Sequence, residues 1–219
     1  DGSNVTWVLT TDGTLILSGT GAVAAYEKRK DTPWGDYNDQ ILRVEVQKGI
    51  TSVSGFCSCY ELQEVSLPEG LISIGKLTFM DCQKLQEIRL PKSLETLGEG
   101  TFASCFALTE IEFPEGLETI GDGVLFHCLS LTSVVIPASV TEMGDRPFSG
   151  DWALKTVEIK GNVPRLSNYS FHECDALQEV LITGSVGTIG DDAFKELDSL
   201  ERVQIAGGLK TIGKRAFWL

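Results

Sequence analysis

The sequence lacks features that define several large classes of protein. It contains no run of 18 or more apolar residues, so we expect no membrane-spanning helix. It has 18 lysines and arginines against 31 aspartates and glutamates, and a net charge of −13 disfavours nucleic acid and anionic membranes as partners. It has no polar low-complexity tract, and its apolar content of 42% is ordinary for a folded chain. These absences leave a folded chain that repels a phosphate backbone or an anionic membrane overall.

The residue patterns of common catalytic and metal sites are also missing. There is no GxSxG, no phosphate-binding loop and no HExxH. The only histidines, His127 and His172, stand near cysteines, but His127 and Cys128 are adjacent and should point in different directions. No CxxC pair or paired-histidine spacing indicates zinc. We therefore expect no enzymatic activity, no cofactor and no metal.

What the chain does contain is a repeat of 23 residues. An Ile, Leu or Met precedes each repeated glycine, an aromatic residue usually follows it by four positions, and a cysteine often follows it by seven. The glycines are Gly75, Gly98, Gly121, Gly144, Gly190 and Gly213, with Ser167 at the one missing position. A fixed period of this length predicts a solenoid, because one unit cannot bury its apolar face without stacking on its neighbours.

One unit shows the expected structure of the repeat. In residues 108–113, Ile111 and Phe113 alternate with Glu110 and Glu112, which predicts a strand that buries the first pair and exposes the second. Strands linked in the same sense form a parallel sheet with right-handed crossovers. The glycine allows a positive φ or a close backbone approach at the opposite bend. We predict a mainly β right-handed solenoid with a concave sheet and short turn, 3-10 or irregular convex segments.

Two further columns run through the repeats. Phenylalanines, with Leu125 substituting once, should form a spine through the stack: Phe79, Phe102, Phe148, Phe171, Phe194 and Phe217. Cysteines at equal positions should form a ladder of buried thiols rather than disulfides: Cys59, Cys82, Cys105, Cys128 and Cys174. Asp151 and Leu197 replace the cysteine, and Ser167 the glycine, which weakens the regularity without threatening the fold.

The first 46 residues differ from the rest. Asp12-Gly13 separates two alternating apolar runs, which is a hairpin signal. We predict an N-terminal β cap over residues 1–46, which covers an edge strand, and about seven and a half repeats over residues 47–219.

The repeated pattern LxxIxLPxxLxxIGxxxFxxC resembles the BspA-like leucine-rich repeats of bacteria, and the segment from Thr6-Trp7 to Pro33-Trp34 is similar to the N-terminal segment found on such proteins. The resemblance implies a leucine-rich repeat solenoid at the cell surface or outside the cell, its signal peptide removed. It also implies attachment through host or matrix proteins, and it brings no catalytic residues with it.

The outward positions of the predicted strands form the first candidate binding surface. Its centre is acidic and crowded, and either a basic partner, a cation or plain solubility accounts for it. The candidate residues are Glu87, Arg89, Glu110, Glu112, Val135 and Glu158. Glu87 and Glu110 should lie about 5 Å apart, the carboxylate separation of retaining glycosidases, but any solenoid with equal glutamates produces that spacing.

A second candidate is the residue just after the cysteine position. Three consecutive repeats place Phe106, Leu129 and Trp152 there. If exposed, this strip has the composition of a protein-interaction anchor; if buried, it packs the turn. Exposure favours a non-enzymatic protein-binding module, and burial favours a structural spacer that presents another domain. A carbohydrate-binding module ranks third, because the strand columns carry no aromatic platform.

Overall fold

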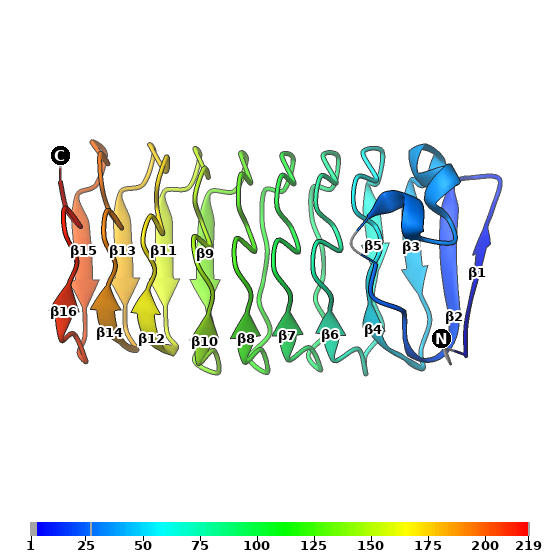
Figure 1. Ribbon diagram of the computed structural model, residues 1–219, viewed down its shortest axis with the longest axis horizontal. Coiled ribbons are helices and arrows are strands. Elements are labelled where there is room, and N and C mark those ends of the chain that lie inside the picture. The colour runs from blue at the N-terminus through cyan, green and yellow to red at the C-terminus, as the bar shows by residue number, and fades with distance from the viewer. Residues whose placement is uncertain (1–3, 27, 219) are drawn as a thin grey trace.

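The computed structural model describes residues 4–26 and 28–218, so residues 1–3 and 27 of the predicted cap lie outside the described residues. The chain is a β solenoid whose repeats stack side by side along one long axis, with the N-terminal segment at one end (Figure 1). The mainly parallel β architecture predicted from the sequence is confirmed. No helix of the described residues is long and apolar enough to cross a membrane.

The repeats form two rows of parallel strands, and the middle repeats contribute strands to the second row alone. The first row follows the predicted strand positions and comprises β3 (Arg43–Val46), β5 (Glu64–Ser66), β9 (Ser133–Ile136), β11 (Thr156–Ile159), β13 (Glu179–Ile182) and β15 (Arg202–Ile205). The second row lies just before or at the repeated glycines and comprises β4 (Ile50–Val53), β6 (Ser73–Ile74), β7 (Thr96–Leu97), β8 (Thr119–Ile120), β10 (Glu142–Met143), β12 (Asn162–Leu166), β14 (Ser185–Ile189) and β16 (Thr211–Ile212). The sequence indicated only the first row.

The first row is interrupted in the middle of the chain. Ile111 and Phe113 are buried and Glu110 and Glu112 exposed, as expected, but the predicted strand over residues 108–113 is wrong. Across the described middle repeats, the isolated bridge between Arg89 and Glu112 is the one strand-type pairing in this row. We attribute the interruption to like-charged glutamates at facing positions, which disfavour close pairing. The second row is continuous here from β4 to β10.

The repeated glycines are explained by close approach, since none of them has a positive φ. A Cβ on Gly121 would lie 2.4 Å from the Glu99 nitrogen of the preceding repeat, and one on Gly144 would lie 2.3 Å from the Asp122 nitrogen. The left-handed positions fall two and six residues later, mostly on other residue types such as Leu77 (φ 55°). Glycine therefore sets the distance between repeats in the second row.

Ser167 marks the place where the second row breaks. Elsewhere the glycine N–H donates to a carbonyl of the preceding repeat, as Gly144 does to Ile120 and Gly190 to Leu166. In the described chain no such bond links Ser167 to the preceding repeat, and β10 and β12 are not paired. The Ser167 Oγ instead accepts the Arg146 N–H at 2.8 Å. The serine side chain thus occupies the space that a glycine leaves for the neighbouring backbone.

The two predicted columns run through the stack and are buried up to the last phenylalanine, Phe217, which is 44% exposed. Stacked rings run from Phe56 to Phe79 and Phe102, and again from Phe148 through Phe171 and Phe194 to Phe217, with buried Leu125 between the two runs. All six cysteines are unpaired and buried. The Sγ of Cys82, Cys105, Cys128 and Cys174 each lies 3.0–3.4 Å from the carbonyl oxygen 26 residues earlier. The buried-thiol ladder is confirmed.

The N-terminal segment forms a hairpin and two short 3-10 helices. β1 (Asn4–Leu9) and β2 (Thr14–Ala22) pair antiparallel around Asp12-Gly13, and β2 also pairs with β3 and β4. The helices are η1 (Arg29–Asp31) and η2 (Gly35–Gln40). Trp34, 2% exposed, stacks on Phe56 at 5.5 Å and donates its indole N–H to the Gly55 carbonyl at 2.9 Å. Trp34 therefore continues the phenylalanine spine into the N-terminal segment.

Candidate functional site

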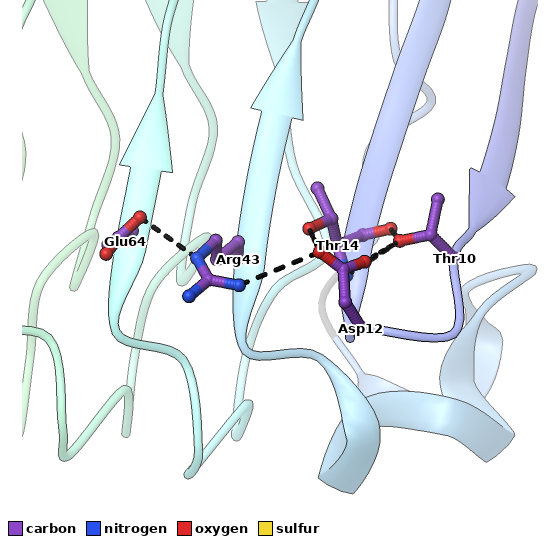
Figure 2. Close-up of polar contacts among 5 residues, drawn as sticks. All are labelled: Thr10, Asp12, Thr14, Arg43 and Glu64. Atoms are coloured by element: carbon purple, nitrogen blue, oxygen red, sulfur yellow. Dashed lines mark hydrogen bonds and ion pairs between the residues drawn. The ribbon is translucent and has the colours of Figure 1, made fainter.

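The outward face of the first row begins at the N-terminal hairpin. Figure 2 shows Arg43 of β3 between Asp12 of the hairpin and Glu64 of β5, with Arg43 Nε 3.1 Å from Glu64 Oε2 and Nη1 3.8 Å from Asp12 Oδ2. The hydroxyl groups of Thr10 and Thr14 both donate to the Asp12 carboxylate. These hydrogen bonds, the one from Thr10 most strongly, hold the pKa of Asp12 below its ordinary value. Charge contacts thus join the hairpin to the first repeats.

Several hollows lie along this face, and two of them contain most of the predicted residues. The first has a volume of about 990 Å³, and its polar lining includes Arg43, Gln47, Glu64, Ser66, Glu87 and Arg89. The second, of about 840 Å³, is lined by four glutamates, Glu87, Glu110, Glu112 and Glu115, and by the cations Arg89 and Lys92. Both hollows border the interrupted part of the first row. The second hollow brings together four of the predicted site residues, Glu87, Arg89, Glu110 and Glu112.

The remaining predicted residues of this face lie in the regular C-terminal part. Val135 of β9, 43% exposed, is directly opposite Glu158 of β11, which is opposite Leu181 of β13. Glu158 is half-buried, and its Oε2 lies 4.0 Å from Nζ of Lys160. This part of the face carries an exposed apolar side chain next to a partly shielded carboxylate.

The strip after the cysteine positions is exposed at one end. Trp152 is 55% exposed, while Phe106 and Leu129 are half-buried. The strip is therefore neither fully buried in the turns nor fully open. Trp152 presents a large aromatic side chain to solvent, and the two preceding repeats extend an apolar surface beside it.

Asp151, the residue before Trp152, was noted in the sequence only as a departure from the cysteine ladder. Its side chain is 0% exposed, and its Oδ1 accepts the Cys128 N–H at 2.7 Å. Its Oδ2 is buried without a hydrogen-bond partner. Burial raises the pKa of Asp151 well above the ordinary value for aspartate. The sequence signal was an acidic residue at a position where other repeats place a buried thiol.

The two histidines lie on the turns next to that of Asp151, since the His127 N–H donates to the Ser149 carbonyl and the His172 carbonyl accepts the Gly150 N–H. His127 is half-exposed while Cys128 is buried, so the two neighbours point in different directions, as expected. The His127 Nε2 and the His172 Nδ1 lie 3.9 and 3.8 Å from the Glu173 carboxylate. No group of three or more His, Cys, Asp or Glu within residues 4–26 and 28–218 is arranged to hold a metal ion.

Comparison with known proteins places this repeat in a family. The family description "BspA type Leucine rich repeat region", with six copies, matches residues 37–154 and 96–219. No curated protein matches the chain. Among solved structures, a leucine-rich repeat protein of T. pallidum is 27% identical, with a TM-score of 0.66, over 90% of this chain and 88% of that one.

Two further structures share the fold. A leucine-rich cell surface protein from Faecalibacterium prausnitzii is 20% identical, with a TM-score of 0.54, over 95% of this chain and 76% of that one. The pneumococcal vaccine antigen PcpA is 20% identical, with a TM-score of 0.55, over 78% of this chain and 50% of that one. Because the family match spans most of the repeats, the chain belongs to the BspA-type leucine-rich repeat family.

Proposed function

We propose that this chain is a non-enzymatic module at the cell surface that binds a protein partner of the host or matrix glycoprotein type. The observation that carries the proposal is the strip: Trp152 is 55% exposed and follows the half-buried Leu129 and Phe106 at equal positions of successive repeats. Exposed aromatic side chains beside apolar neighbours are the usual anchors of protein interfaces.

Charged groups on the same repeats as the strip support recognition of a specific partner. The hollow around Glu110 and Glu112 belongs to the same repeats as Phe106, and Val135 and Glu158 belong to those of Leu129 and Trp152. Charges at the rim of an apolar anchor fix orientation and speed association more than they add affinity. We therefore propose a contact patch over the three consecutive repeats that contain Phe106, Leu129 and Trp152. The contact patch is defined as Phe106, Leu129, Val135, Trp152 and Glu158, with the glutamates of the second hollow at its edge.

A structural spacer that presents another domain is the second candidate. The half-burial of Phe106 and Leu129 favours this function, because side chains that pack the turn present less apolar surface to a partner.

Solid-phase binding to a panel of matrix and plasma glycoproteins tests the proposal. The wild-type chain is compared with Trp152→Ser and Val135→Ser, and Trp218→Ser serves as a matched control because it removes a similarly exposed tryptophan at the far end. We expect saturable binding that weakens about thirty-fold in Trp152→Ser, the loss typical of an interface anchor, and is unchanged in Trp218→Ser. Equal binding of all variants would refute the patch, and no binding at tens of micromolar would favour the spacer.

A further inference from the structure

The turn that presents Trp152 contains a buried carboxyl group with an unsatisfied oxygen. Asp151 is 0% exposed, and only its Oδ1 has a hydrogen-bond partner, the Cys128 N–H at 2.7 Å. In the neighbouring repeats the same position holds a thiol whose Sγ contacts a carbonyl 26 residues earlier, as Cys174 does with Phe148 at 3.0 Å. A thiol carries one donor hydrogen; a carboxylate carries none, whereas a protonated carboxyl carries one.

The groups that face Asp151 do not neutralise it. From the preceding repeat it faces the thiol and backbone N–H of Cys128, and from the following repeat it faces the thiol of Cys174. His127, His172, Glu173 and the exposed Asp175 lie on the same turns at the surface. Within the part of the chain that the structure describes, no lysine or arginine forms an ion pair with Asp151.

An ionised carboxyl in this position has two ways to avoid an uncompensated buried charge. It can take up a proton and keep the turn closed, or the turn can open so that water reaches the carboxylate. Asp151 and Trp152 are consecutive, and the closed turn directs the first inward and the second outward. Opening the turn therefore also displaces Trp152 from its place beside Leu129.

We propose that the turn at residues 148–152 is a proton-linked element, which holds Trp152 in the contact patch at acidic pH and releases it as the pH rises. This regulation rests on the proposed function of the patch, but the turn's response to pH can be tested without any partner.

The direction follows from the proton balance of the two states. Burial raises the pKa of Asp151 in the closed turn, whereas in the open turn the hydrated side chain ionises near its ordinary value of about 3.9. The closed turn thus binds more protons. Its stability is fully present below the ordinary aspartate pKa and is lost as the pH rises toward the raised value. Between the two values, opening becomes up to about ten-fold more favourable for each pH unit.

Hydrogen–deuterium exchange measured by mass spectrometry tests this response. Exchange of peptides covering residues 148–154 is followed between pH 5 and 8.5, and each rate is divided by the intrinsic chemical rate at that pH. We expect the corrected rate of the wild type to rise with pH, and the corrected rates of Asp151→Asn and Asp151→Cys to stay constant. The equivalent turns around Cys82 and Cys105, whose thiols contact the carbonyls of Phe56 and Phe79 and not Asp151, serve as internal references in the same spectra.

Two additional measurements separate Asp151 from its neighbours. The double variant His127→Gln/His172→Gln should retain the wild-type dependence, because it leaves Asp151 in place and removes only the two histidines on the neighbouring turns. The ¹⁹F spectrum of chain labelled with 5-fluorotryptophan, with the Trp152 line identified by Trp152→Phe, should show that line shifting over the same pH range. A constant wild-type exchange rate, an equal dependence in Asp151→Asn, loss of the dependence in the histidine variant, or a Trp152 line that does not move would each overturn the proposal.

Discussion

Replacing Gly121 with alanine should separate two adjacent repeats and destabilise the solenoid. A Cβ at this position would lie 2.4 Å from the Glu99 nitrogen and 2.5 Å from the Gly98 carbonyl carbon, and both atoms belong to backbone that no side-chain rotation can move. Ordinary contact begins near 3.4 Å, so the two turns must move apart by about 1 Å.

That movement breaks two hydrogen bonds between repeats. Gly121 donates to the Leu97 carbonyl at 2.8 Å and Gly100 to the Asp122 carbonyl at 2.7 Å, and an added 1 Å takes both beyond the bonding range. Their loss costs about 1–3 kcal/mol and the residual strain about as much again, so we expect a destabilisation of about 2–6 kcal/mol. For a chain of this size each kcal/mol lowers Tm by about 2–4 °C.

Urea unfolding followed by circular dichroism measures the effect. Gly207→Ala is the matched control, because a Cβ there meets no atom within 4 Å and the residue has no positive φ. We expect Gly121→Ala to unfold at a clearly lower urea concentration than Gly207→Ala. Equal midpoints would refute the view that the repeated glycines set the distance between repeats.

Three further predictions concern the core. Asp151→Cys, which restores the thiol ladder, should stabilise the chain by about 1–3 kcal/mol at pH 7.5, because it removes a buried unsatisfied oxygen. The gain should shrink as the pH falls to about 3, below the ordinary aspartate pKa of about 3.9, where Asp151 is protonated in both the folded and the unfolded chain. A pH-independent difference in urea midpoint would contradict this. The six buried cysteines should resist a thiol-specific reagent at pH 8 until urea is added. The reason is that burial raises the pKa of Cys59 to about 12 and that of Cys105 further, so that little reactive thiolate forms. Rapid labelling of the native chain would count against the buried ladder. Phe102→Ala should lower the free energy of unfolding by about 3–5 kcal/mol, because the buried Phe102 ring stacks on Phe79 at 5.7 Å. Trp152→Ser should change it by less than about 0.5 kcal/mol, because Trp152 is exposed. Similar losses for the two variants in thermal unfolding would disprove the assignment of Phe102 to the core and Trp152 to the surface.

The sequence was sufficient to predict the features that depend on side-chain period. The buried and exposed sides of residues 108–113, the phenylalanine spine and the thiol ladder all follow from apolar residues at constant spacing, because stacking places equal residues on top of one another. The glycine pattern was equally visible, but its two physical explanations could be separated only by φ angles and by the distance to the preceding repeat.

The features that depend on pairing between backbones were not predictable. Residues 108–113 have the alternation of a strand, yet the hydrogen-bonded ladder requires a spacing that facing glutamates disfavour. Ser167 was visible as a missing glycine, but the loss of pairing between β10 and β12 depends on where its hydroxyl finds a donor. For the patch, composition identified Trp152, whereas the burial of Asp151 without a full set of partners could be found only in the structure.

The two interruptions of the strand rows have a mechanical consequence, because they fall at different repeats. The first row lacks regular pairing between β5 and β9, where the second is continuous, and the second is open between β10 and β12, where β9 pairs with β11. Tension applied along the long axis would therefore meet at least one intact ladder at every junction. Pulled from its two ends, the rod should yield in stages at these half-open junctions, and each stage would lengthen the molecule while the remaining repeats keep their contacts.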